Sequence, residues 1–282
     1  MIVVTGATGQ LGRLVIAALL KKTTASNLVA AVRNVEKAKD LAALGVQVRH
    51  ADYTQPATWD AALKGADKVL LISSSEIGQR AQQHRNVIDA AKRAGVKLLA
   101  YTSVLHADTS PLGLATEHRD TEAMIRASGV PFTLLRNGWY TENYMASVPS
   151  ALAHGAVYGC AGDGRISSAS RADYAEAAAT VLTSGTQAGK IYELAGDSAY
   201  TLTQLAAEIS RRSGKSIKYE NLPEVEYKNL LVKVGLPEVV ADLLADSDMG
   251  ASKGALFDGG HQLSKLIGRP TTALATSVAA VI

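Results

Sequence analysis

Short runs of consecutive apolar residues alternate along the chain with longer stretches in which apolar residues recur at helical spacing. The short runs are rich in Val, Leu and Ile and are bounded by glycine or polar residues, which is typical of strands buried on both faces. Seven runs are predicted as strands: residues 2–5, 28–32, 46–49, 68–72, 98–102, 132–136 and 191–194. Strands separated by helices predict a parallel sheet with helices on both faces.

Local signals mark the helices between these strands. Apolar spacing predicts helices over residues 11–20, 79–94 and 173–182. Asn34 is a suitable N-cap for a helix after the second strand, and Gly95 is suited to end the helix over residues 79–94. The sequence Thr201-Leu202-Thr203-Gln204 matches a capping box and predicts the start of a further helix.

The regular pattern weakens after Arg136. A polar and aromatic loop covers residues 137–143, and a glycine-rich stretch covers residues 155–164. From residue 201 to the end, the pattern predicts short helices and turns. We therefore expect an α/β domain over residues 1–196 and a smaller, mainly helical C-terminal lobe over residues 197–282 that contributes to the substrate cleft.

A glycine-rich turn follows the first strand and opens the first helix. Its three glycines, Gly6, Gly9 and Gly12, have the spacing of a dinucleotide-binding turn. We expect Gly6 to permit the tight turn, Gly9 to let the backbone approach a pyrophosphate, and Gly12 to allow the helix to pack closely. The helix N-terminus then offers N–H groups to the phosphates. With the alternating strands, this turn predicts a Rossmann-type, doubly wound parallel sheet that binds NAD(P).

The end of the second strand distinguishes the two nicotinamide cofactors. NAD-specific sites usually place Asp or Glu here, where the carboxylate bonds the ribose 2′-hydroxyl. This chain has Arg33 followed by Asn34 and no acid. An arginine can pair with the 2′-phosphate and stack on the adenine. The sequence therefore predicts NADPH as the cofactor, with weaker use of NADH.

The composition narrows the class of protein. The 282 residues are 47% hydrophobic and 20% charged, and the 29 basic and 26 acidic side chains are scattered, so we expect no nucleic-acid partner. The only cysteine, Cys160, excludes an internal disulfide and suits a reducing compartment. No signal-like segment and no apolar stretch of about 20 residues is present. We expect a cytoplasmic protein without membrane insertion, and the six histidines show no metal-like spacing.

Together these residues resemble the atypical short-chain dehydrogenases of the NmrA-like family, over nearly the whole chain. The resemblance rests on Thr5 to Gly9, Arg33-Asn34, Asp52-Tyr53, the serines at 73–75, and the segment from Ser128 to Asn143. It implies the fold, NADPH without flavin or metal, and quinone reduction. It also implies the following cofactor-binding residues: Gly6, Ala7, Thr8, Gly9, Gln10, Leu11, Arg33, Ser73, Ser74, Ser75, Asn137, Gly138, Trp139, Tyr140, Thr141, Glu142 and Arg171.

One departure from the larger dehydrogenase family carries chemical information. None of the ten tyrosines has a lysine four residues later, so the Tyr-x-x-x-Lys pair of typical members is missing. This argues against alcohol oxidation, which must remove a hydroxyl proton as hydride leaves. A quinone is a strong electrophile and needs positioning and hydrogen-bond donors. We expect direct hydride transfer to a quinone, giving the quinol. The alternatives are a redox sensor without turnover and a reductase of another flat electrophile.

Substrate contacts are expected beyond the carboxyl ends of the strands. The candidates are Tyr53 after the third strand and Tyr140, Asn143 and Tyr144 after the sixth. Aromatic rings can stack on a quinone, and hydroxyl and amide groups can bond its carbonyls. No catalytic residue and no oligomeric state is assigned. His84 and His118 are expected on helix surfaces, with approach to the pocket as the alternative for His118, which precedes the sixth strand.

Overall fold

The computed structural model describes all residues from 1 to 282, and the chain divides into two compact units. The sheet unit comprises Met1–Ala107, Thr116–Asn137 and Arg171–Glu193. The lobe unit comprises Asp108–Ala115, Gly138–Ser170 and Leu194–Ile282. The chain therefore passes between the units several times, and its last crossing lies close to the boundary expected at residue 196.

A seven-stranded sheet forms the centre of the sheet unit, in the order β3-β2-β1-β4-β5-β6-β8. Its strands are β1 (Ile2–Val4), β2 (Leu28–Val32), β3 (Gln47–His50), β4 (Lys68–Leu71), β5 (Leu98–Val104), β6 (Phe132–Asn137) and β8 (Ile191–Leu194). The first six pair in parallel, with Val3 of β1 beside Val29 of β2 and Val69 of β4. The strand order reverses at β1, which is where such sheets bind their ligands. The doubly wound parallel sheet is confirmed.

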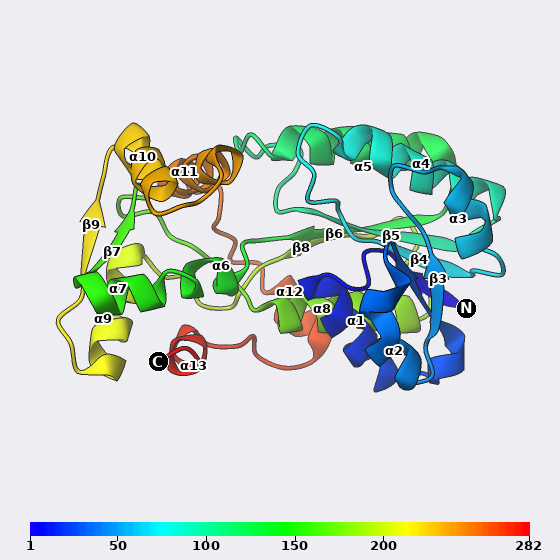
Figure 1. The fold of residues 1–282 in the computed structure, drawn as a ribbon, viewed down its shortest axis with the longest axis horizontal. Helices are drawn as coiled ribbons and strands as arrows, with labels where there is room; N and C mark the ends of the chain where they lie inside the picture. Colours follow the sequence, from blue (N-terminus) through cyan, green and yellow to red (C-terminus); the bar gives the residue numbers. More distant parts are fainter. The chain divides into compact units, whose positions relative to one another are not determined.

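Helices cover both faces of this sheet (Figure 1). They are α1 (Gln10–Leu20), α2 (Lys39–Ala43), α3 (Ala57–Ala62), α4 (Arg80–Arg93), α5 (Ala115–Ser128) and α8 (Arg171–Thr183), with short 3₁₀ turns at Ala25–Asn27 and Val35–Ala38. Figure 1 shows α3, α4 and α5 on one face and α1, α2 and α8 on the other.

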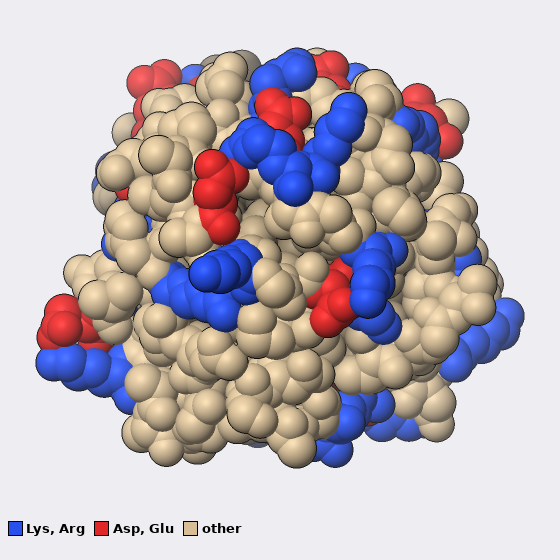
Figure 2. Space-filling model, turned by 90° about the vertical axis from the view of Figure 1, so that its right-hand side faces the viewer, with Lys and Arg blue, Asp and Glu red and all other residues tan.

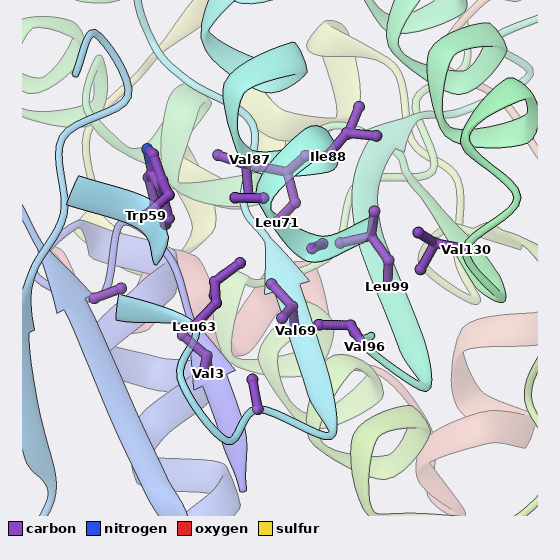
Figure 3. Close-up of a cluster of buried hydrophobic side chains, with 14 of the residues drawn as sticks. Val3, Trp59, Leu63, Val69, Leu71, Val87, Ile88, Val96, Leu99 and Val130 are labelled. Atoms are coloured by element: carbon purple, nitrogen blue, oxygen red, sulfur yellow. The ribbon is translucent and has the colours of Figure 1, made fainter. Parts of the chain in front are cut away.

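The core on the α3 and α4 face is built from branched aliphatic side chains and one tryptophan (Figure 3). Val69 and Leu99 of the strands and Val87 of α4 are fully buried there. Trp59 is 1% exposed, and its indole N–H donates to the Asp52 carbonyl at 2.8 Å. This bond satisfies the one polar atom of the side chain, so the ring can fill the core without an unpaired donor.

The predicted helix ends are confirmed. The Asn34 side chain accepts the Glu36 backbone N–H at 2.9 Å. Gly95 follows α4 with a φ of +65°, a left-handed conformation that glycine adopts without strain. Thr201 and Gln204 exchange both bonds of a capping box at the start of α9 (Leu202–Ser213).

The lobe unit is mainly helical, with a small two-stranded sheet. Besides α9, it contains α6 (Thr141–Met145), α7 (Val148–His154), α10 (Glu224–Lys233), α11 (Glu238–Ser252), α12 (Gln262–Ile267) and α13 (Leu274–Ala279). Strands β7 (Ala156–Gly159) and β9 (Lys218–Asn221) pair in parallel. The sequence pattern missed both, because β7 lies in the glycine-rich stretch and β9 is mostly polar.

Basic and acidic side chains are interspersed on the face shown in Figure 2, as the scattered charges of the sequence indicate. No helix is both long and apolar enough to cross a membrane.

Candidate functional site

The glycine turn after β1 has the geometry that its sequence predicts. Gly6 has a φ of +56°, in the left-handed region. A Cβ atom on Gly12 would lie 2.4 Å from the Gly6 carbonyl oxygen and 2.7 Å from the Ala7 Cα. Only a glycine at position 12 therefore lets α1 begin this close to the turn. The predicted roles of Gly6 and Gly12 in the turn are confirmed.

The surroundings of the turn fit a dinucleotide. No side chain caps α1, and its first turn carries no acidic residue, so the positive end of the helix is not neutralised locally. The Asn137 side chain ends β6 at the same edge of the sheet, and its buried oxygen has no hydrogen-bond partner within the protein. A buried amide oxygen without a donor is costly, and a donor on a bound cofactor would satisfy it.

Arg33 follows β2 at the carboxyl edge of the sheet, as predicted. Its guanidinium lies 3.2 Å from Glu76, which follows β4. Because β1 lies between β2 and β4, this ion pair spans the end of the strand that carries the glycine turn. The Arg33 side chain is 70% exposed, so solvent screens the pair and little energy holds the guanidinium in this position.

The serines after β4 are held by the neighbouring elements. The Ser73 backbone N–H donates to the Thr102 hydroxyl of β5 at 2.9 Å. The Ser74 N–H donates to His84 Nε2 of α4 at 2.9 Å, and the Ser74 carbonyl accepts from Arg80. The loop is therefore fixed largely through its backbone. In addition, the Ser73 hydroxyl accepts from the Thr102 hydroxyl at 3.4 Å, and the Ser74 hydroxyl accepts the Glu76 N–H at 3.1 Å.

The prediction that His84 and His118 lie on helix surfaces is wrong. Their exposed fractions are 0% and 4%, because α4 and α5 turn these polar positions toward each other and toward the sheet. His84 Nδ1 lies 2.8 Å from the Thr121 hydroxyl, and His118 Nδ1 lies 2.7 Å from the Tyr101 hydroxyl. Burial, with the nearby Arg80 cation, lowers the pKa of each histidine to about 3. Both rings are therefore neutral.

These histidines should make the protein acid-sensitive. Unfolding restores an ordinary histidine pKa near 6.5, so below that pH the unfolded chain binds protons that the folded chain does not. Stability should therefore fall as the pH falls, by about 2 kcal/mol per histidine between about pH 7 and pH 5. Urea unfolding of the wild type and His84→Gln at both pH values measures this. The decrease in the free energy of unfolding should be smaller in the variant by about the contribution of one histidine. An equal decrease would contradict the lowered pKa of His84.

Tyr53 lies under the glycine turn. Its hydroxyl donates to the Ile72 carbonyl at 2.7 Å and lies 2.6 Å from the Thr5 hydroxyl. Its ring stacks on Trp59 with centroids 5.4 Å apart. Burial raises the pKa of this phenol. These bonds brace the ends of β1 and β4, and the predicted contact of Tyr53 with substrate stays a prediction.

The loop after β6 enters the lobe unit, where the segment 167–170 holds it. The Thr141 N–H donates to the Ala169 carbonyl at 2.9 Å, and the Ala169 N–H donates to the Trp139 carbonyl at 3.1 Å. The Thr141 and Ser168 hydroxyls are 2.8 Å apart. Arg171 begins α8 in the sheet unit, where α8 packs along α1. The roles of Gly138, Tyr140, Glu142 and Arg171 at the cofactor stay predictions.

A cavity of about 340 Å³ lies within the lobe unit. Leucine and valine side chains of β7, α10, α11 and the segment after α10 form its apolar wall, and the polar groups come mainly from α6, α7, β7, α10 and α11. Asn143 and Tyr144 line it, as does Trp139, whereas Tyr140 does not. The volume falls in the range of small-molecule sites. The remaining polar lining comprises Ser147, Ser150, His154, Tyr158, Tyr227 and Asp248.

Asp248 and Tyr227 are site candidates that the sequence pattern did not reveal. The Tyr144 hydroxyl donates to Asp248 Oδ1 at 3.0 Å, across 104 positions of sequence. No sequence motif marks Asp248, which lies in the middle of a helix. The chain has no group of three or more His, Cys, Asp or Glu side chains arranged to hold a metal ion.

Comparison with known proteins adds to this geometry. The model of the NmrA-like family matches residues 1–274. Quinone oxidoreductase 2 of Escherichia coli is 63% identical over 278 residues, covering 99% of this chain and 97% of that protein. The resemblance to this family seen in the sequence is confirmed.

Two solved structures cover the whole fold. The Escherichia coli NADPH-dependent quinone oxidoreductase complexed with NADPH superposes with a TM-score of 0.98 at 63% identity, covering 100% of this chain and 99% of that one. The Citrobacter triphenylmethane reductase complexed with NADP(H) superposes with a TM-score of 0.96 at 42% identity, covering 100% of both chains.

Proposed function

The chain belongs to the NmrA-like family, and we propose that within it this protein is an NADPH-dependent oxidoreductase that reduces quinones to quinols. The observation that carries the proposal is the 63% identity, over nearly the full length of both chains, to a quinone oxidoreductase whose structure contains NADPH. The glycine turn, Arg33 and the lobe cavity supply the local chemistry that this activity requires.

The sheet unit would hold the cofactor at the carboxyl edge of the sheet. The turn from Gly6 to Leu11 and the N-terminus of α1 would bind the pyrophosphate through backbone N–H groups. Arg33 would exchange Glu76 for the 2′-phosphate, a bidentate and more highly charged partner. Ser73 to Ser75 and the residues from Asn137 to Glu142 would complete the site. The bound nicotinamide supplies a hydride.

The lobe cavity would hold the quinone. Its apolar wall suits a flat ring, while Asn143 and Tyr144 offer hydrogen bonds to the quinone oxygens. These donors stabilise the charge that develops on oxygen when hydride reaches the ring. We propose the expected lobe, residues 197–282, as a contributor to this site, because Tyr227 and Asp248 line the cavity. Neither a flavin nor a metal is needed for this reaction, and the reducing environment that suits the single Cys160 favours the cytoplasm.

A second candidate is reduction of another flat electrophile. It is favoured by the 42% identity to a Citrobacter reductase named for triphenylmethane dyes, a second class of aromatic electrophile. A redox sensor of the same family would bind NADPH without turning it over.

Purified protein, NADPH and a water-soluble benzoquinone test the proposal. We expect NADPH to be oxidised only when quinone is present, with one quinol formed per NADPH. The loss of the near-ultraviolet absorbance of NADPH measures this oxidation. Parallel assays with a triphenylmethane dye compare the two substrate classes. Tight NADPH binding without turnover of any acceptor would favour the sensor and refute the enzyme.

A further inference from the structure

The lobe cavity contains a buried carboxyl group that makes no ion pair. Asp248 of α11 is 3% exposed and lines the cavity together with Tyr144 of α6. Asp248 Oδ1 accepts the Tyr144 hydroxyl at 3.0 Å, and Oδ2 accepts the Cys160 backbone N–H at 3.0 Å. Two neutral donors therefore fix the orientation of the carboxyl group, and no cation stabilises its charge.

The groups that face Asp248 are almost all uncharged. They are the phenols of Tyr144, Tyr219 and Tyr227, the Cys160 thiol, and His154 across the cavity. On its own helix, Asp246 accepts the Gly113 N–H, and Asp242 pairs with Lys228 at 2.7 Å. Burial raises the pKa of Asp248 to about 6, and its two hydrogen bonds only partly oppose this rise. The carboxyl group can therefore carry a proton near neutral pH.

We propose that Tyr144 and Asp248 form the proton relay of quinone reduction, in which Tyr144 protonates the reduced quinone and Asp248 resupplies Tyr144. The inference rests on the proposed function and adds the proton donor to it. It is carried by the contact between the two side chains and by their shared position on the cavity wall.

The relay balances the reaction. A hydride brings two electrons and one proton to the quinone, which becomes a quinolate anion. As the new O–H bond forms on the quinolate oxygen, the O–H bond of Tyr144 breaks, and the tyrosine oxygen takes the proton of the Asp248 carboxyl. Water entering the cavity then returns one proton to the Asp248 carboxylate, so each turnover consumes one proton from solvent.

The direction of the Tyr144–Asp248 hydrogen bond controls the relay. When Asp248 is ionised, the Tyr144 proton points to the carboxylate. When Asp248 is protonated, it donates to the Tyr144 oxygen and leaves the Tyr144 proton for the quinone. This reversal supplies acid catalysis without the Tyr-x-x-x-Lys pair that the chain lacks.

The test compares the pH dependence of kcat in NADPH-saturated wild type, Tyr144→Phe and Asp248→Asn, with benzoquinone as the acceptor. Wild-type kcat should fall as the pH rises above about 6. In each variant, kcat should be about 100-fold lower than in the wild type, and this high-pH limb of the pH profile should be absent. The double variant should lose no more than either single variant, because both residues serve one step. Asp246→Asn makes the same chemical change on the same helix and should keep the wild-type profile.

The Kd for NADPH, measured by fluorescence, should stay unchanged in every variant, which separates lost chemistry from lost folding. Should Asp248→Asn not fold, Tyr144→Phe and the solvent deuterium isotope effect on wild-type kcat decide the matter. Variants that bind NADPH and keep the wild-type kcat and pH limb would overturn the relay while leaving quinone reduction intact. A wild type that oxidises no NADPH with quinone would overturn the function and the relay together.

Discussion

Arg33→Asp should raise the Kd for NADPH by about 100-fold and leave the Kd for NADH nearly unchanged. A charge-assisted hydrogen bond contributes about 1.5–3 kcal/mol, and an aspartate would also repel the 2′-phosphate. Since about 1.4 kcal/mol corresponds to a tenfold change in affinity, the two effects together reach this magnitude. NADH has a 2′-hydroxyl, which can donate a hydrogen bond to a carboxylate. Fluorescence titration with both cofactors measures the two constants.

Arg93→Asp is the matched control, because it makes the same reversal of charge on an exposed arginine of the same unit. Arg93 ends α4 and pairs with Asp60 at 2.7 Å. A helix between two parallel strands runs back across the sheet, so its last turn lies at the amino edge, away from the glycine turn. Arg93→Asp should leave both Kd values near wild type. If Arg33→Asp lost affinity for NADPH and for NADH equally, pairing of Arg33 with the 2′-phosphate would be refuted.

Gly12→Ala should weaken NADPH binding about tenfold or more and lower the free energy of unfolding by about 1–3 kcal/mol. The added Cβ would lie 2.4 Å from the Gly6 carbonyl oxygen, so α1 or the turn must move. Either movement displaces the backbone N–H groups that would bind the pyrophosphate. Urea unfolding and NADPH titration measure the two effects.

Gly185→Ala is the control for this substitution. Nothing lies within 4 Å of a Cβ at Gly185, and its φ is not in the left-handed region. It should therefore keep wild-type stability and cofactor binding. Wild-type behaviour of Gly12→Ala itself would show that the close approach of helix and turn is not required.

Most elements of the sheet unit were predictable because their signals are local. The predicted bounds of β2 and β8 match the structure, and those of β1, β4 and β6 differ by one residue at the carboxyl end. Buried parallel strands need continuous apolar runs, and helix ends need particular residues such as Asn34 and Gly95. The helix expected after Asn34 is a 3₁₀ turn followed by the short α2, whereas neither the short α3 nor the longer α5 was predicted.

The candidate site was predictable in part. The glycine turn and Arg33 occupy the expected strand ends, and Asn143 and Tyr144 line the lobe cavity, while their contact with substrate stays a prediction. The sequence did not indicate that His84 would hold the Ser74 backbone or that Asp248 would meet Tyr144. A histidine on a mixed-polarity helix and an aspartate inside another helix look like solvated positions until the packing of their helices is known.

The sequence by itself determined the strands of the seven-stranded sheet, the glycine turn and the basic residue beside it, because each depends on neighbours within a few positions. Tertiary structure alone decided the pairing of β7 with β9, the burial of the two histidines, and the contact between Tyr144 and Asp248. The physical reason is that exposure, hydrogen-bond partners and pKa are set by groups distant in sequence. The pKa of Asp248 rises because residues from α6, β7, β9 and α10 exclude water around it.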